Sequence, residues 1–423
     1  MTNSSGAPTR PLDRRQGLWY AVALGLAAMI GAGLFSTFAP AAASAGRWLV
    51  LAVVIAAGVA GVNAHSVARL TARYPDSGGA YVYGRERLGL AWGHLAGWAI
   101  VVGTIAACAA MAMTLAVHVW PGFAKPIAVL AVVAVLALNV QGVHRSARMA
   151  FGIVALVVTL VVVFGIVMLL APAVTVDTPP PAVPGSGSPP GVIRGAGFMF
   201  FAFVGYAQVA TLGEQITDPR RTIPRAIGIA LAIVLALYAL VAVALTNSLG
   251  AGWVAAREAP LAEAAEISAW PWLGPALRVA AVLAAGGALL ALVLGASRAL
   301  LAMARDRHLP PALAVVDGPH GTPRRAEAVI AALVIVLIVL IDLRGAIGLS
   351  SFLVLTYYAI ANASAWTLER RPSAKIVPTL GLVACVVVAL LLPWQSVVAG
   401  VVILAVGAFV GWARYTTREG RDA

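Results

Sequence analysis

Side chains able to do covalent or metal chemistry are scattered along this chain. The six histidines, at positions 65, 94, 118, 144, 308 and 320, form no cluster with acidic, Ser or Lys groups of the kind that an active site needs. Cys108 and Cys385 both fall inside apolar stretches, where a small buried hydrophobe is the favoured role. The pattern predicts no enzyme, no metal site and no cofactor.

The backbone itself offers a different chemistry at two glycine-containing interruptions, residues 29–33 and 203–206. Breaking a helix inside hydrocarbon leaves N–H and C=O groups without partners. The freed N–H groups around residues 32–33 would present the positive end of a helix dipole to a carboxylate. The freed carbonyls around residues 201–202 would accept from an ammonium group. Together these groups predict a site for a zwitterion.

Glu214 is the only acidic residue that we place within a span, near its cytoplasmic end. A charge at full membrane depth costs ~2.5–3.5 kcal/mol unless it is paired. Two interpretations stay open. Glu214 is either part of an inner gate or a protonatable group, or it is an interfacial carboxylate paired with Arg220, Arg221 or Arg225.

The elements that must position these groups are membrane helices. The 423 residues are 61% hydrophobic and 11% charged, and mean hydropathy is +0.94, far above a soluble domain. The chain therefore predicts an all-α polytopic membrane protein. Twelve transmembrane helices are expected at 18–39, 48–70, 88–119, 126–142, 149–172, 192–214, 225–249, 272–303, 326–343, 346–367, 374–392 and 395–415.

A formal charge of +13 would suggest nucleic-acid binding in a soluble protein, but here the basic residues separate by side. With twelve spans both termini share a compartment, and most of the 29 Lys and Arg lie on that side. The exceptions are Arg47, Lys125, Arg194, Arg257, Arg278 and Arg344. The positive-inside rule then predicts cytoplasmic N- and C-termini, with the first helix uncleaved and no nucleic-acid partner.

The two interruptions lie five helices apart, and an odd spacing reverses direction in the membrane. This indicates an inverted five-plus-five helix repeat with broken helices one and six. The expected organisation is a cytoplasmic tail 1–17, a first repeat 18–172, a second repeat 192–367, two C-terminal helices 374–415 and a tail 416–423. Short helices are also expected within 74–89, on the cytoplasmic face, and within 253–270, over the external mouth.

Five segments resemble the amino acid–polyamine–organocation permeases, in order and at family spacing. They are GLAAMIGAGLF at 25–35, YPDSGGAYVY at 74–83, FFAFVGY at 200–206, ATLGEQITDPRRTIPRAI at 210–227 and SRALLAMARD at 297–306. The resemblance runs from helix one through helix ten. It implies a leucine-transporter-type fold with ten core helices and two more at the C-terminus.

The resemblance also implies a binding site for the substrate. Its carboxylate would meet helix one at Ile30, Gly31, Ala32 and Gly33. Its other contacts would be Phe201, Ala202, Phe203, Val204 and Gly205 of helix six, with Phe201 or Phe203 closing over it. Family members that prefer cationic substrates often carry Asp after the sixth-helix aromatic, whereas this chain reads Tyr206-Ala207-Gln208. A neutral substrate is therefore favoured.

The implied function is an amino acid permease of a bacterial cytoplasmic (inner) membrane, moving a small neutral amino acid by alternating access. The partners would be that substrate, the lipid bilayer and a proton as coupling ion. Sodium is disfavoured because residues 279–296 of helix eight contain no Ser or Thr. An exchanger, a cationic amino acid or polyamine transporter and a non-transporting sensor remain as alternatives.

Overall fold

The computed structural model of the chain describes residues 17–74, 79–141, 147–170, 185–210, 216, 218–305, 312, 324–368 and 371–422. Regular structure within these residues consists of α-helices and short 3-10 helices, with no strand. A helix satisfies its backbone hydrogen bonds within one segment, which is what the interior of a lipid bilayer requires. The predicted all-α character is confirmed for this part of the chain.

The helices follow one another with short connections. In chain order they are α1 (Leu18–Gly33), α2 (Phe38–Ala45), η1 (Gly46–Trp48), α3 (Leu49–Arg73), α4 (Ala80–Leu88), α5 (Leu90–Val119), η2 (Pro121–Phe123), α6 (Ala124–Val140), α7 (Ala147–Leu170), α8 (Pro189–Phe203), η3 (Val204–Tyr206), α9 (Ala207–Ala210), α10 (Pro219–Ser248), α11 (Ala251–Ala255), α12 (Pro260–Glu266), α13 (Leu273–Arg305), α14 (Arg324–Leu340), α15 (Leu343–Leu368), α16 (Pro372–Leu391) and α17 (Trp394–Asp422).

Several of these helices are long and apolar enough to cross a membrane. Nine candidate spans lie in the described part of the chain: Phe38–Arg73, Leu90–Val119, Pro121–Asn139, Met149–Leu170, Arg221–Ser248, Leu273–Leu301, Leu343–Leu368, Pro372–Leu391 and Trp394–Ala413. Three further helices are shorter, with 16 residues in α1, 15 in α8 and 17 in α14. The number twelve and the inverted repeat stay predictions.

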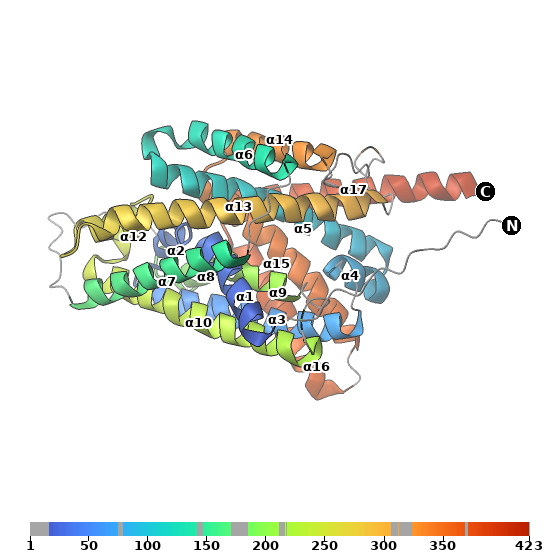
Figure 1. Ribbon diagram of the computed structural model, residues 1–423. Coiled ribbons are helices and arrows are strands. Elements are labelled where there is room, and N and C mark those ends of the chain that lie inside the picture. The colour runs from blue at the N-terminus through green and yellow to red at the C-terminus, as the bar shows by residue number, and fades with distance from the viewer. Residues whose placement is uncertain are drawn as a thin grey trace.

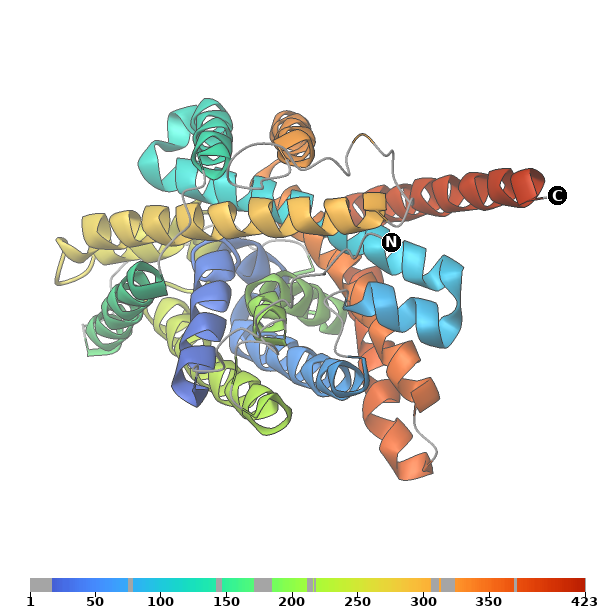
Figure 2. The same ribbon diagram turned by 45° about the vertical axis from the view of Figure 1, so that its right-hand side comes forward.

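The short helices α1 and α8 occupy the middle of the bundle (Figures 1 and 2). Helix α1 packs against α7, α8, α10 and α13, while α8 packs against α2, α3, α15 and α16. Helix α12 lies at one end of the bundle and the C-terminal end of α17 at the other (Figure 1). We refer to the first of these as the α12 end.

Burial separates the inner helices from the outer ones. The most apolar windows of α5 and α15 are each 78% buried, whereas those of α6 and α17 are each 17% buried. A run of small residues along α5, Ala106 to Ala110, is almost fully buried and allows close approach of neighbouring helices. The outer helices present their apolar faces to the surroundings, as lipid-facing helices do.

The first interruption lies at residues 34–37, between α1 and α2, and not at 29–33 as predicted. The glycines stay helical because a glycine weakens a helix without ending it. The hydroxyls of Ser36 and Thr37 donate to the carbonyl of Gly33, at 3.4 and 2.8 Å, and compete with the helical bonding pattern. Pro40 has no N–H and its ring clashes with the carbonyl four residues earlier. These three residues explain where α1 ends.

The second interruption lies where the sequence predicts it. Helix α8 ends at Phe203, a 3-10 turn covers Val204 to Tyr206, and the short helix α9 follows. Such a change of hydrogen-bonding pattern inside a membrane helix often marks a functional position. We call α1 with α2 the first interrupted helix, and α8, η3 and α9 the second.

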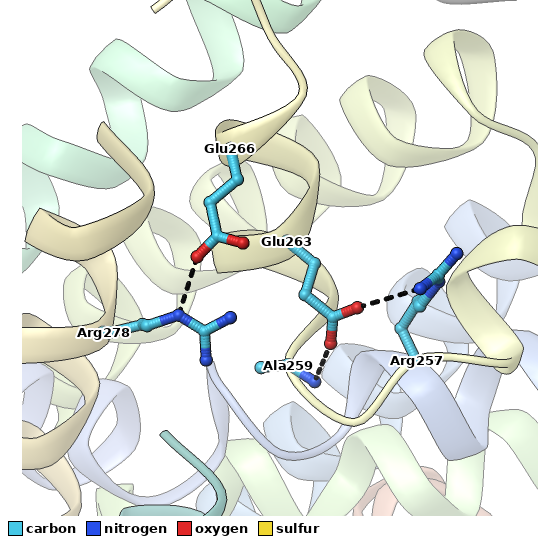
Figure 3. A network of polar contacts seen from close by, with 5 residues as sticks. All are labelled: Arg257, Ala259, Glu263, Glu266 and Arg278. Atoms are coloured by element: carbon cyan, nitrogen blue, oxygen red, sulfur yellow. Dashed lines mark hydrogen bonds and ion pairs between the residues drawn. The ribbon is translucent and has the colours of Figure 1, made fainter. Parts of the chain in front are cut away.

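The two short helices expected between spans are also present. Helix α4 is joined to α15 by a hydrogen bond from the Ala80 N–H to the Tyr357 hydroxyl, at 2.9 Å. At the α12 end, Arg257 contacts Glu263 at 3.4 Å and Arg278 contacts Glu266 at 2.7 Å (Figure 3). These two ion pairs tie α12 to the preceding loop and to α13.

Candidate functional site

The two interrupted helices touch each other through glycine. A Cβ atom added to Gly33 would overlap the Cα and Cβ atoms of Ala202 on α8. An added Cβ at Gly205 would lie 2.5 Å from the backbone nitrogen of Met29 on α1, and as close to the carbonyl carbon of Ala28. Real Cβ contacts are essentially never that short, so both positions require glycine in this conformation.

Tyr238 of α10 bridges the interrupted helices. Its hydroxyl donates to the carbonyl oxygen of Met29 at 3.0 Å and lies 3.5 Å from that of Ala202. The side chain is fully buried. Its ring packs edge-on against Phe203, with ring centroids 5.2 Å apart, and against Phe38, at 6.0 Å. One side chain therefore contacts both α1 and α8, and one aromatic residue beside each interruption.

Sequence reasoning missed Tyr238, although a signal was present. It is the only aromatic residue in the predicted span 225–249. A buried tyrosine hydroxyl in apolar surroundings needs a hydrogen-bond partner, and main-chain carbonyls near an interruption are the nearest ones available. The sequence alone does not show which carbonyls accept from the Tyr238 hydroxyl.

The predicted residues of the first interrupted helix lie on the inside of the bundle. Ile30 is 1% exposed. A Cβ on Gly31 would approach Ala284 and Ala288 of α13 at 3.3 and 3.4 Å, so Gly31 faces α13 and Gly33 faces α8. Ala32 lies between them in α1, and its side chain is outside the described set.

The predicted residues of the second interrupted helix surround its bend. Phe201, Ala202 and Phe203 are buried, whereas Val204 and Gly205 are half-buried. Phe203 contacts Tyr238, as described above. Tyr206, the next residue, is fully buried and stacks on Tyr358 of α15, with ring centroids 5.7 Å apart. The bend is thus bordered by α1 on one side, α10 on another and α15 on a third.

The main-chain N–H groups without a helical acceptor are not those that the sequence predicts at residues 32–33. Ala32 and Gly33 belong to α1, where their N–H groups take part in the helix hydrogen bonding. The first turn of α2 has no side-chain cap, and there the N–H groups of Phe38 and Ala39 have no intrahelical acceptor. The positive end of the second half-helix therefore lies a few residues further along the chain than predicted.

Of the acidic residues considered, Glu214 lies outside the described residues. The prediction that it is the only acidic residue within a span is wrong, because the predicted span 326–343 contains Glu327 and Asp342. Glu327 lies in the first turn of α14 and is fully buried. Neither of its carboxylate oxygens has a hydrogen-bond partner among the described residues. Its position within the predicted span 326–343 was the signal that could have revealed it.

Comparison with known proteins gives these features a context. A family model described as amino acid permease matches residues 17–414, nearly the whole chain. This chain belongs to the amino acid permease family. The permease is accordingly a multi-pass membrane protein of a transporter family, and the resemblance to the amino acid–polyamine–organocation permeases is confirmed.

Three relatives illustrate the range of similarity. An uncharacterized transporter of Mycobacterium tuberculosis is 51% identical over 426 residues, covering 98% of the permease and 96% of the relative. The branched-chain amino acid permease BcaP of Bacillus subtilis is 24% identical, covering 95% and 93%. The vacuolar cationic amino acid transporter 2 of Arabidopsis thaliana is 28% identical, covering 80% of the permease and 58% of the relative.

Proposed function

We propose that the permease carries a small neutral amino acid across the cytoplasmic membrane of a bacterium by alternating access. The observation that carries this proposal is the meeting of two interrupted helices in the middle of the bundle, joined by the hydroxyl of Tyr238. Interrupted helices that meet near the midplane are where transporters of inverted-repeat architecture bind their substrates.

The substrate would lie between the two interruptions. Its carboxylate would accept from main-chain N–H groups at the positive end of α2, around Phe38 and Ala39. Its ammonium would donate to carbonyls at the end of α8, around Phe201 and Ala202. The stretch from Ile30 to Gly33 would form the opposite wall. Because Gly33 and Ala202 are in contact here, the interrupted helices must separate to admit the substrate.

The side chains around the bend support a neutral substrate. The described residues nearest to it, from Phe201 to Tyr206 and from Ile30 to Phe38, include no acidic group. Bringing a lysine or arginine side chain to this depth without a counter-charge would be costly. BcaP, named for branched-chain amino acids, agrees with a neutral substrate. The second candidate, a cationic amino acid, is favoured by the relatives named as cationic amino acid transporters.

The proposal includes a topology and a coupling ion. Twelve spans in an inverted repeat would be obtained if each interrupted helix, and the short α14, crosses the membrane once. The basic residues of the sequence then favour cytoplasmic termini. Proton symport through Glu214 is the favoured coupling, and exchange of internal for external amino acid is the alternative.

Thermal stabilisation tests the substrate directly. Purified permease would be heated with each of a panel of neutral, acidic and cationic amino acids, since a ligand that binds only the folded state stabilises it by RT ln(1 + [L]/Kd). We expect stabilisation by one or more small neutral amino acids, absent in Gly33→Ala. Stabilisation by lysine, arginine or putrescine alone would overturn the neutral preference and favour the second candidate.

A further inference from the structure

A groove opens between α5 and α13 at the α12 end of the bundle. It does not include the contact between Gly33 and Ala202 of the interrupted helices. Its volume is about 250 Å³. Two polar side chains and four aliphatic ones line it: His118, Val119, Arg278, Val279, Val282 and Leu283. Neither the substrate site nor the proposed transport cycle makes use of this groove.

The aliphatic wall of the groove faces outward. Val119 is 54% exposed, Val279 58% and Leu283 41%, although all three belong to candidate membrane spans. On α13, Val279, Val282 and Leu283 are three and four residues apart and form one stripe on the helix surface. Side chains exposed on such a span face hydrocarbon, so this wall is suited to an acyl chain rather than to water.

The head of the groove carries a cation, Arg278, whose terminal nitrogens have no hydrogen-bond partner among the described residues. Arg278 bonds Glu266 through Nε, and Figure 3 shows one of its two terminal guanidinium nitrogens pointing away from that carboxylate. An arginine fork of this kind matches the oxygens of a phosphate. His118 adds a buried imidazole, of which Nδ1 contacts the Thr114 carbonyl at 2.8 Å, so that the other ring nitrogen is left for a second partner.

Aromatic residues place this head at the membrane surface. Trp120 follows α5 directly and is 60% exposed, and Trp272 precedes α13 directly and is 57% exposed. Phe123 and Trp270, beside them, are 56% and 48% exposed. Tryptophan concentrates at the level of lipid headgroups. Arg278, one turn into α13, therefore lies at the depth where phosphates are found.

We propose that this groove binds one phospholipid, with its phosphate on the guanidinium of Arg278 and the upper part of an acyl chain along Val279, Val282 and Leu283. Charge at the head, hydrocarbon along the wall and the aromatic border all match this single ligand. His118 also packs edge-on against Phe35, in the first interruption, with ring centroids 5.6 Å apart. His118 thus connects the groove to the loop between α1 and α2.

The chain offers matched controls for a test. Arg278→Gln removes the phosphate partner and also breaks the pair with Glu266. Glu266→Gln breaks the same pair and leaves the guanidinium in place. Arg257→Gln removes a second arginine, which pairs with a glutamate of the same short helix but does not line this groove. Leu283→Trp fills the aliphatic wall without changing any charge.

Delipidated permease in detergent would be titrated with palmitoyl-oleoyl phosphatidylglycerol, and bound lipid counted by native mass spectrometry alongside the shift in Tm. We expect one tightly held lipid in the wild type, Glu266→Gln and Arg257→Gln. Affinity should fall about tenfold in Arg278→Gln, the size expected for losing a charge-assisted pair, and fall likewise in Leu283→Trp.

Equal lipid retention by all the variants would overturn the proposal, as would loss in Glu266→Gln and Arg257→Gln together with Arg278→Gln. Inorganic phosphate and a neutral amino acid would be titrated in parallel. If phosphate or the amino acid stabilises the protein, and this effect is lost in Arg278→Gln but kept in Leu283→Trp, the groove binds a free anion or the substrate and not lipid. Substrate stabilisation in the wild type is read separately, so failure here leaves the proposed function standing.

Discussion

Gly33 and Gly205 mark two places beside the interruptions where the interrupted helices allow no side chain. The neighbouring atoms are main chain and Cβ atoms, which cannot rotate out of the way. Overpacking of this kind costs ~1–3 kcal/mol. The same two glycines belong to the proposed substrate site, so crowding there affects binding as well as packing.

Replacing Gly33 or Gly205 by alanine is therefore expected to reduce uptake about tenfold or more, because about 1.4 kcal/mol corresponds to a factor of ten. Initial uptake rates and Tm without substrate would be measured together. Gly58→Ala and Gly228→Ala, at positions with open space around them, are the controls and should transport normally. Normal uptake by both site variants would refute the assignment of the site to this contact.

Tyr238 gives a second test at the same scale. Tyr238→Phe keeps the ring packed against Phe203 and Phe38 but removes the hydroxyl that joins the interrupted helices. A net hydrogen bond contributes ~0.5–1.5 kcal/mol, so KM for uptake should rise roughly two- to tenfold. Tyr20→Phe on α1, where the ring packs against Phe151, is the control. A lower Tm with unchanged KM would leave Tyr238 a purely structural residue.

At the scale of the helices, sequence reasoning located the second interruption and misplaced the first. The pattern FFAFVGY ends α8 where predicted, at Phe203. In the first interrupted helix the glycines led us to predict an interruption at residues 29–33. The helix instead ends where the hydroxyls of Ser36 and Thr37 donate to the Gly33 carbonyl and where Pro40 follows. Side-chain competition for one carbonyl is a local three-dimensional event, and a search for glycines does not detect it.

Contacts between distant segments explain the rest of what sequence alone left out. Gly33 and Gly205 could be selected from their motifs, whereas their partners, Ala202 and Met29, depend on how α1 and α8 cross. Tyr238 lies 209 residues from Met29 in the chain. Only the packing of α10 against both interrupted helices brings its hydroxyl to those carbonyls.

The direction of the helices in the membrane is testable with single cysteines. Ser186→Cys and Gly252→Cys, at the α12 end, should react with an impermeant thiol reagent added outside cells, and Ser373→Cys, in the first turn of α16, should not. Native Cys108 and Cys385 are buried and should give little background. The reverse labelling pattern would invert the topology and exchange the outer and inner halves of both interrupted helices.

For the whole molecule, the packing of α1 on α13 bears on which ion gradient drives transport. Gly31 faces Ala284 and Ala288, and α13 has no hydroxyl side chain between Val279 and Ala296. A sodium ion needs several oxygen ligands, as other hard cations do, and this interface offers only main-chain ones. An inward proton gradient, and not a sodium gradient, should therefore drive uptake into proteoliposomes.

Two glutamates allow the proton prediction to be sharpened. Glu214→Gln should abolish the proton-driven component, whereas Glu327→Gln should retain it, because α14 packs mainly against α5, α6 and α13. Uptake driven by sodium alone would contradict the packing argument. Stimulation only by amino acid preloaded inside the vesicles would make the permease an exchanger.

Uptake of labelled amino acids by proteoliposomes tests the central claim most directly, because it measures transport by this protein alone. Wild type, Gly33→Ala and Gly58→Ala would be reconstituted at equal density and offered neutral and cationic amino acids in turn. The account predicts saturable uptake of a small neutral amino acid by wild type and Gly58→Ala, lost in Gly33→Ala and not inhibited by lysine, arginine or putrescine. Uptake no greater than in protein-free liposomes for every amino acid would contradict it.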